Sequence, residues 1–236
     1  IIIPASFAVP ASSVDRSKSG FNAQMHQVEA ARPGGNNLPA PLNQLNNLII
    51  DAATGQPAAN LIDNSGVTLP GEAGKWTGFV FREEAVINYN QDARDNPDAG
   101  AGNFRPDKPI PGIPGLSATA TDNIAMRATT FLELKKGVWR MGVNSDDGFL
   151  VSSAVHPLDA APLQLGIFDG GRGSADTLFS FEVEADGIYP FTLVWWEGGG
   201  GANVEWFAFD QVTGERILIN DSANAKAVKA FRESTV

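Results

Sequence analysis

The sequence has no cysteine, and this absence excludes two kinds of stabilising chemistry. Neither disulfides nor thiolate metal sites can hold these 236 residues together. Histidine is almost as scarce, since His26 and His156 are the only two, and neither belongs to a metal-binding motif. A zinc site is therefore not expected, and both histidines are interpreted as ordinary strand or loop residues.

Basic residues and long apolar runs are also few. The chain has 17 Lys+Arg against 27 Asp+Glu, a formal net charge of -10, and such a field repels the phosphates of nucleic acids. We therefore expect no nucleic-acid partner, but a cation or a neutral polar ligand. The longest apolar run, Ile188–Trp196, is far shorter than the ~20 residues of a membrane span, so no span is predicted.

The first seventy residues are rich in Pro, Gly, Asn and Ala. They are predicted to form an extension (residues 1–70) that packs on the main domain (residues 71–236). Within the extension, Gly20–Val28 alternates like a strand, and the apolar spacing of Leu42–Ile50 suits a short helix. The start, Ile1–Pro4, lacks a basic flank and an initiator methionine, so it is not a complete signal peptide. We expect the chain to be a piece of a longer protein.

From Trp76 onward, strand-forming runs alternate with turn residues. Trp76–Phe81 and Ala85–Tyr89 open the series, whereas Asp92–Gly115 contains five prolines and is predicted to lie outside any sheet. Later runs place large apolar residues at every second position, which is how two sheets fill the space between them. We predict an all-β, antiparallel, jelly-roll-like β-sandwich. The residues expected to face its core are Trp139, Met141, Val143, Phe179, Phe181, Val183, Tyr189, Phe191, Leu193, Trp195, Val204, Trp206 and Ala208.

Two turns and a helix are predicted in the last part of the chain. Ala185–Gly187 and Val212–Gly214 are interpreted as hairpin turns, because glycine adopts positive φ readily. Asp221 or Ser222 is predicted to cap a short C-terminal helix that runs through about Phe231, with basic residues near its end to suit the helix dipole.

Two segments carry the most specific chemistry in the chain. Asp146 and Asp147 are adjacent carboxylates, and Gly148 after them permits a tight turn. Further along, the glycine run Gly198–Gly201 lets main-chain carbonyls approach an ion, and Asn203 offers a neutral oxygen. Calcium takes about six to eight oxygen ligands, so we predict a Ca²⁺ site held by Asp146, Asp147 and Asn203. The alternative is that Ser-Asp-Asp-Gly is only a hairpin turn, since Asp and Gly are common turn residues.

A ligand is expected to contact residues around the ion. The loop Phe168–Gly173 does not form a phosphate loop, because no Gly-Lys-Ser/Thr follows and the next run predicts a strand, but two of its side chains suit a binding surface. Trp195 and Trp196 are consecutive and so point to opposite faces. One of them lies in the core, and the other either stacks on sugars or is covered by the first seventy residues. The predicted ligand-binding residues are Gly199, Gly200, Gly201, Asp169, Arg172 and Trp196.

Four segments, Leu134–Val143, Ser145–Leu150, Gly187–Phe191 and Gly201–Trp206, follow one another in a characteristic order and spacing. In this respect the chain resembles the domain family named after anthrax protective antigen, which occurs in flocculin-type adhesins, some glycosidases and bacterial surface proteins. The resemblance implies a β-sandwich whose calcium is held by two consecutive aspartates joined by a cis peptide, here Asp146 and Asp147. In some members that ion coordinates sugar hydroxyls. The glycine run departs from the loops of the sugar-binding adhesins, so no sugar specificity is carried over.

No assembled catalytic motif is found, and an enzyme is not predicted. The chain has no serine elbow, histidine triad or metalloprotease helix. A glycosidase needs two carboxylates that face each other, about 5 Å apart in a retaining enzyme. Glu182 and Glu184 share a strand face that points to solvent, and Glu197 and Glu205 have no evident partner.

Two function hypotheses follow. The first is an extracellular, calcium-dependent carbohydrate-binding or adhesion module of a larger secreted or cell-surface protein, with a glycan as partner. The second is a structural or assembly module that contacts a neighbouring protein subunit. It is motivated by the apolar strand Ile1–Ile3, which either pairs with its own sheet or adds to a neighbour's edge and so causes self-association.

Overall fold

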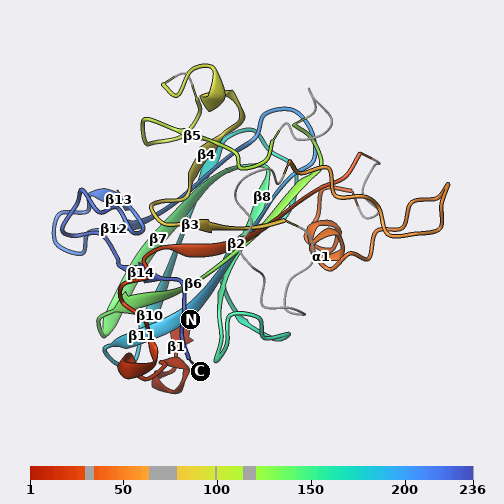
Figure 1. Cartoon of the computed structure of the whole chain (residues 1–236). Helices are drawn as coiled ribbons and strands as arrows, with labels where there is room; N and C mark the ends of the chain where they lie inside the picture. Colours follow the sequence, from red (N-terminus) through yellow and green to blue (C-terminus); the bar gives the residue numbers. More distant parts are fainter. Residues whose placement is uncertain (30–34, 64–78, 99, 114–120, 236) are drawn as a thin grey trace.

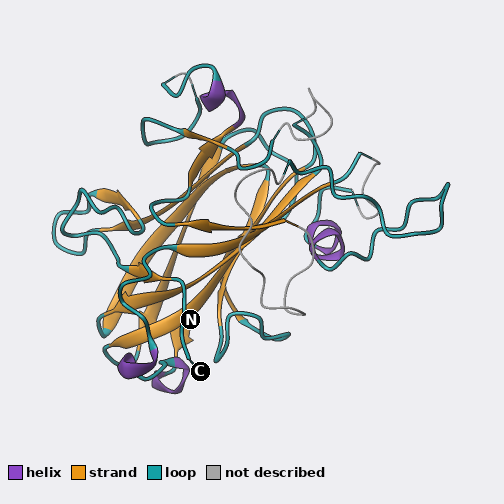
Figure 2. Ribbon diagram, in the orientation of Figure 1, coloured by secondary structure: helices purple, strands orange, loops and turns teal. Residues whose placement is uncertain are grey.

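Two β-sheets packed face to face form the body of the protein, as Figures 1 and 2 show. The computed structural model describes residues 1–29, 35–63, 79–98, 100–113 and 121–235. The strands are β1 (Ile2–Ile3), β2 (Phe21–Gln27), β3 (Phe79–Glu83), β4 (Asn88–Asn90), β5 (Lys108–Pro109), β6 (Ile124–Leu134), β7 (Gly137–Asp146), β8 (Gly148–Ser153), β9 (Leu163–Phe168), β10 (Ala175–Val183), β11 (Gly187–Glu197), β12 (Asn203–Phe209), β13 (Arg216–Leu218) and β14 (Ala230–Phe231). The helices are α1 (Pro39–Leu45) and the 3₁₀ turns η1 (Ala5–Phe7), η2 (Ala11–Ser13) and η3 (Gln91–Arg94).

The two sheets divide the strands between them. Sheet A has the order β1-β10-β7-β12-β4-β5, with β13 also paired to β12, and sheet B has the order β3-β2-β6-β11-β8-β9, with β14 also paired to β6. Pairing is antiparallel except between β1 and β10 and between β4 and β5. The predicted all-β sandwich is therefore confirmed.

Alternating apolar residues fill the space between the sheets, as predicted. Phe191 and Trp195 of β11 and Val143 of β7 are fully buried. The rings of Phe191 and Trp206 lie 6.3 Å apart and tilted, so the two sheets contact each other through aromatic side chains. Fully burying one such side chain stabilises the fold by roughly 1.5–3 kcal/mol.

The N-terminal residues supply strands to both sheets. The predicted strand Gly20–Val28 is confirmed as β2, which lies between β3 and β6. The first strand pairs with its own sheet, because Ile2 and Ile3 lie beside Glu182 and Val183 of β10. The predicted boundary at residue 70, like residues 76–78 of the predicted strand Trp76–Phe81, lies outside the described residues, so the division into 1–70 and 71–236 stays a prediction.

The predicted C-terminal helix is wrong. Turns follow Asp221, and the chain then forms β14, in which Ala230 and Phe231 pair with Leu132 and Phe131 of β6. Phe231 packs in a small cluster with Phe131, Val14 and Ile188. Pairing with the part of β6 that β2 does not reach and burial of Phe231 therefore override the local helical signal.

Two other local predictions need correction. Ala185–Gly187 is not a hairpin turn, because it connects β10 in sheet A to β11 in sheet B. The proline-rich segment is not wholly outside the sheets, because β5 pairs with β4 at the end of sheet A, an edge position that tolerates proline. Val212–Gly214 does form the predicted hairpin between β12 and β13, with Gly214 at φ 71°.

The single α-helix among the described residues lies beside the sandwich, at the right of Figure 1. It covers Pro39–Leu45, so it begins and ends earlier than the predicted range Leu42–Ile50. Asn47, at φ 61°, takes the chain out of helical geometry. No helix in the described part of the chain is long and apolar enough to cross a membrane.

Candidate functional site

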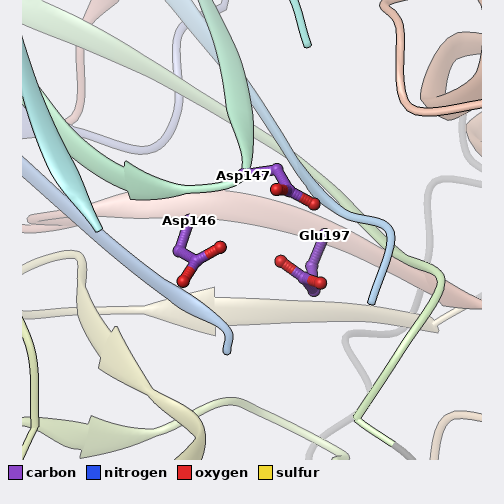
Figure 3. Close-up of side chains that lie close together, drawn as sticks. All are labelled: Asp146, Asp147 and Glu197. Atoms are coloured by element: carbon purple, nitrogen blue, oxygen red, sulfur yellow. The ribbon is translucent and has the colours of Figure 1, made fainter. Parts of the chain in front are cut away.

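Three carboxylates meet at one end of the sandwich, where the chain passes between the sheets. Asp146 ends β7 in sheet A, and Asp147 leads into β8 in sheet B through an Asp146–Asp147 peptide bond that is cis. Glu197 ends β11 in sheet B. One oxygen from each of the three side chains lies within 4.8 Å of the others, and Figure 3 shows the carboxylates gathered around a common space.

Gly148 is required by packing at this crossing. A Cβ atom there would lie 2.1 Å from a ring carbon of Trp196 and 2.8 Å from the carbonyl oxygen of Phe168. Because β7 and β8 belong to different sheets, Ser-Asp-Asp-Gly is not the hairpin turn that the alternative interpretation offered.

Hydrogen bonds from three separate segments fix the Asp147 side chain. Its Oδ1 accepts from the backbone N–H of Arg172 at 2.7 Å, and its Oδ2 accepts from the N–H of Gly198 at 2.8 Å and from Asn36 Nδ2 at 2.5 Å. Asp147 is 4% exposed, so it is both buried and oriented.

The buried carboxylates of the cluster repel one another, and without a cation only bound protons can reduce this repulsion. Burial, followed by repulsion from Asp147 and Asp146, raises the pKa of Glu197 to about 9. Burial and the neighbouring Asp147 likewise raise the pKa of Asp146 to about 6. Crowded, buried carboxylates take up either protons or a cation.

Asn203 joins the cluster from β12. It lies directly opposite Asp146 in the ladder between β12 and β7, so the two side chains share a face of sheet A. Its Nδ2 donates to Asn144 Oδ1 at 2.8 Å. Its Oδ1 is buried and has no hydrogen-bond partner among the described residues, which leaves an oxygen suited to ligating a cation.

These residues fit a calcium ion. Calcium prefers carboxylate and amide oxygens, and Asp146, Asp147, Glu197 and Asn203 offer both at the end of one sandwich. The buried Asn203 Oδ1 without a partner is the observation that favours an ion over a purely structural hydrogen-bond network, because buried polar atoms are normally satisfied.

The predicted glycines connect β11 to β12 beside the carboxylates. Gly199, Gly200 and Gly201 are exposed. A Cβ at Gly201 would lie 2.8 Å from Asp146 Oδ2, and the N–H of Gly200 donates to Asp122 Oδ1 at 3.2 Å. Their ligand-binding role stays a prediction, with the three residues placed at the rim next to Asp146.

Asp169 and Arg172 lie on the other side of Asp147 and make internal contacts. Asp169 Oδ1 accepts from the N–H of Leu38 at 2.6 Å. The Arg172 guanidinium donates to the oxygens of Ser145, Asp147 and Thr177 and stacks 4.2 Å from the Phe168 ring centroid. Both side chains therefore shape the site, and their predicted contact with a ligand remains to be tested.

Trp196 does not offer a stacking face. Its side chain is 0% exposed and belongs to an apolar cluster with Leu45, against which Leu42 and Leu38 pack. Its Nε1–H donates to the backbone oxygen of Asn36 at 3.2 Å. The prediction of Trp196 as a ligand-binding residue is wrong because the N-terminal segment covers it, as the other interpretation of the Trp195-Trp196 pair expected.

Sequence reasoning missed two residues of the site. The sequence suggests Glu197 only as a glycosidase carboxylate, although its position between a buried strand and a glycine run matches that of a ligand at a strand tip. Asn36 lies far from the cluster in sequence, and nothing in the surrounding Gly34–Leu38 segment signals its contact with Asp147. Glu182 of β10 and Glu184, just after the end of that strand, are exposed, as expected.

A separate groove lies away from the carboxylate cluster. A hollow of about 540 Å³ lies at the end of the sandwich where β7 begins, and Arg16, Lys135, Trp139 and Lys229 are among its lining residues. None of the residues predicted for the site lines it, and it contains no cluster of carboxylates like that of Asp146, Asp147 and Glu197 in the described residues.

No protein-family model and no curated protein matches the chain. Among solved structures, the PA14 domain of MpAFP antifreeze protein matches with a TM-score of 0.52 and 14% identity, over 92% of this chain and 93% of that one. The PA14 sugar-binding domain from an RTX adhesin gives a TM-score of 0.49, 16% identity and coverage of 86% and 95%. The epithelial adhesin 9 A domain from Candida glabrata, in complex with Galβ1-4GlcNAc, matches with a TM-score of 0.48 and 12% identity, over 97% of this chain and 94% of that one.

The chain has a PA14-type fold. The likeness to the antifreeze-protein domain, at a TM-score of 0.52, confirms at the level of fold the resemblance to the anthrax protective antigen family. At this low identity the PA14 match establishes the fold alone, and any ligand has to be argued from the residues of the site.

Proposed function

We propose that this PA14-type domain is a calcium-dependent carbohydrate-binding or adhesion module of a secreted or cell-surface protein. The observation that carries the proposal is the convergence of Asp146, Asp147 and Glu197 within 4.8 Å, next to the buried, unpartnered oxygen of Asn203. The resemblance of the sequence to the anthrax protective antigen family supports the same conclusion.

The chemistry suits an ion that also contacts a ligand. Calcium takes about six to eight oxygen ligands. If each of the four side chains supplies one oxygen, coordination positions remain for backbone carbonyls, water or hydroxyls. Gly199–Gly201 are exposed beside Asp146 and leave room for a ligand that brings hydroxyl oxygens. Adjacent hydroxyls of a sugar ring have that geometry, and a neutral glycan is not repelled by the net charge of -10.

The extracellular location is part of the same proposal. Calcium sites of extracellular modules commonly bind with a Kd of about 10⁻⁴–10⁻³ M, whereas cytosolic sensors bind more tightly. A Kd for the wild-type protein in that weaker range supports function in a calcium-rich exterior, and a Kd near about 10⁻⁸ M counts against it.

The test combines calcium binding with glycan binding. Isothermal titration with CaCl₂ and a glycan array, run once with calcium and once with chelator, are applied to the wild type and to D146N/D147N. The control is E182Q/E215Q, which makes the same change of net charge at two exposed residues. We expect calcium binding and calcium-dependent glycan signals in the wild type and control, and neither in D146N/D147N.

The outcomes separate the parts of the proposal. Absence of calcium binding in the wild type rejects the metal site and everything built on it. Calcium binding without any calcium-sensitive glycan signal rejects the carbohydrate function and leaves the assembly function as the stronger candidate.

One observation favours assembly as the second candidate. β1 is a two-residue strand at the edge of sheet A, and its Ile2 and the preceding Ile1 are 52% and 61% exposed. An exposed apolar edge is a pairing surface for a neighbouring subunit. Light scattering of the wild type and of I2K decides this, because a monomeric wild-type protein at high concentration rejects self-association through β1.

A further inference from the structure

Asn36 connects the carboxylate cluster to the N-terminal segment. Its side-chain Nδ2 donates to Asp147 Oδ2 at 2.5 Å, and its backbone oxygen accepts from Trp196 Nε1 at 3.2 Å. Both contacts join residues more than a hundred positions apart in sequence. Asn36 thus touches both a candidate metal ligand and the tryptophan that lies beneath the helix.

Two glycines, Gly171 and Gly198, lie next to the Asn36 side chain. A Cβ at Gly198 would lie 2.7 Å from Asn36 Nδ2, and a Cβ at Gly171 would lie 3.0 Å from the same atom. Side chains at either position would displace the amide. Gly171 and Gly198 therefore leave the room that the Asn36 side chain needs to reach Asp147. Gly199–Gly201 lie instead beside Asp146.

The residues after Asn36 extend the attachment into α1. The N–H of Leu38 donates to Asp169 Oδ1 at 2.6 Å. Leu42 and Leu45 then pack on the cluster of apolar side chains around Trp196. The segment Asn36–Leu45 is thus held to the sandwich by polar contacts at its start and by apolar burial at its end.

We propose that Asn36 is a positioning residue of the metal site, and that calcium binding and docking of the segment Asn36–Leu45 stabilise each other. The inference rests on the proposed function, since it assumes that Asp147 ligates calcium. Groups that hydrogen-bond a metal-ligating side chain orient it, and their loss costs about 10–100-fold in metal affinity. Asn36 reaches Asp147 only when its segment is docked, so an ion that needs Asp147 oriented favours the docked segment, and the coupling is reciprocal.

The first experiment compares N36A with N37A. Asn37 is the adjacent amide residue, and its Nδ2 lies 3.5 Å from the backbone oxygen of Asp169, so it tests loss of an amide that does not contact the cluster. We expect the calcium Kd, measured by isothermal titration, to rise about 10–100-fold in N36A and to stay at the wild-type value in N37A.

The second experiment measures hydrogen exchange of the backbone amides of residues 40–46, all of them except Pro41, with and without calcium. We expect calcium to slow exchange in the wild type and in N37A, and to have little effect in N36A. A merely structural role for Asn36 predicts faster exchange in N36A at every calcium concentration and an unchanged Kd, and that result overturns the proposal.

A variant far from the ion tests the coupling in the reverse direction. L42S weakens the apolar contact of α1 with Trp196 and leaves the four proposed ligands and Asn36 unchanged. We expect weaker calcium binding in L42S together with faster exchange of residues 40–46. Faster exchange with an unchanged Kd rejects the coupling even if N36A fails to fold.

The proposal and the function on which it rests fail in different ways. A wild-type protein that binds no calcium rejects both. A wild-type protein that binds calcium with the same Kd as N36A rejects only the role of Asn36.

Discussion

Asn203 lies directly opposite Asp146 across the β12–β7 ladder, and its side-chain oxygen is buried without a partner among the described residues. This pairing places an amide oxygen from one strand beside a carboxylate from the next. A metal site built from paired strand ends depends on the register of the sheet, because a shift of one residue moves every side chain to the other face.

Substitution of Glu197 tests the third carboxylate of the site. E197Q removes a negative charge from the cluster, and calcium affinity depends on ligand charge, so we expect the calcium Kd to rise by at least about 10-fold. Thermal stability without calcium should be unchanged or higher, because Glu197 no longer faces Asp146 and Asp147 as an acid. The exposed E182Q is the control, and equal calcium affinity in E197Q and E182Q contradicts a ligand role for Glu197.

Trp196 is expected to stabilise the fold without contacting a sugar. Truncation of a fully buried tryptophan leaves a large cavity, so W196A should lower the free energy of unfolding by about 3–5 kcal/mol, measured by urea titration. W196F keeps an aromatic ring at the site and should retain much of the stability and any glycan binding. A W196A protein with wild-type stability and lost glycan binding supports the surface role that the burial of Trp196 contradicts.

Gly148 gives a prediction about packing at the crossing between sheets. G148A places a methyl group 2.1 Å from the Trp196 ring, and overpacking of this kind costs about 1–3 kcal/mol or more. The matched control is G173A, because a Cβ at Gly173 meets nothing within 4 Å. Urea unfolding should show a lower free energy of unfolding in G148A and almost no change in G173A. Equal free energies of unfolding in the two variants would show that the structure accommodates the methyl group at position 148.

We expect His26 to make the stability of the fold depend on pH. It is 2% exposed in β2, and burial, against a smaller opposing effect of a hydrogen bond with Asn47, lowers its pKa from 6.5 to about 4. The unfolded chain therefore binds the proton more tightly than the folded one. The contribution of neutral His26 is complete above about pH 6.5 and is lost as the pH falls towards about 4, by up to about 3 kcal/mol.

The measurement for His26 is a difference between variants. Urea unfolding of the wild type and H26Q at pH values from 7 to 4.5 cancels the carboxylates that titrate in both proteins. We expect the wild-type advantage to shrink as the pH falls, while the exposed H156Q follows the wild type. Parallel curves for the wild type and H26Q show that His26 does not titrate in this range.

The part of the fold that follows from period-two alternation could be predicted from sequence. Phe179 and Phe181, for example, alternate with the polar residues Ser180 and Glu182, and this burial of one strand face is visible in the local sequence. The C-terminal segment shows the limit of that reasoning. The residues that end in Phe231 carry helix-like signals, but their conformation is decided by an available edge of β6, which local sequence does not reveal.

The candidate site was predictable to the same extent. Asp146 and Asp147 are adjacent, so their proximity is visible in the sequence, and the resemblance to a known domain family gives them a role. Glu197 reaches the same point because β11 pairs with β8. Asn36 reaches it because the N-terminal segment packs on the sandwich. Such contacts depend on tertiary arrangement, which composition and spacing do not encode for a single sequence.

The chain crosses between the layers twice at this tip, once through Asp147 and once through Gly198–Ala202. An ion held there would draw donors from both sheets, with Asp146 and Asn203 on one and Glu197 on the other. Sliding one sheet past the other would then pull the coordination sphere apart. A load applied along the strands would therefore lower the affinity for such an ion.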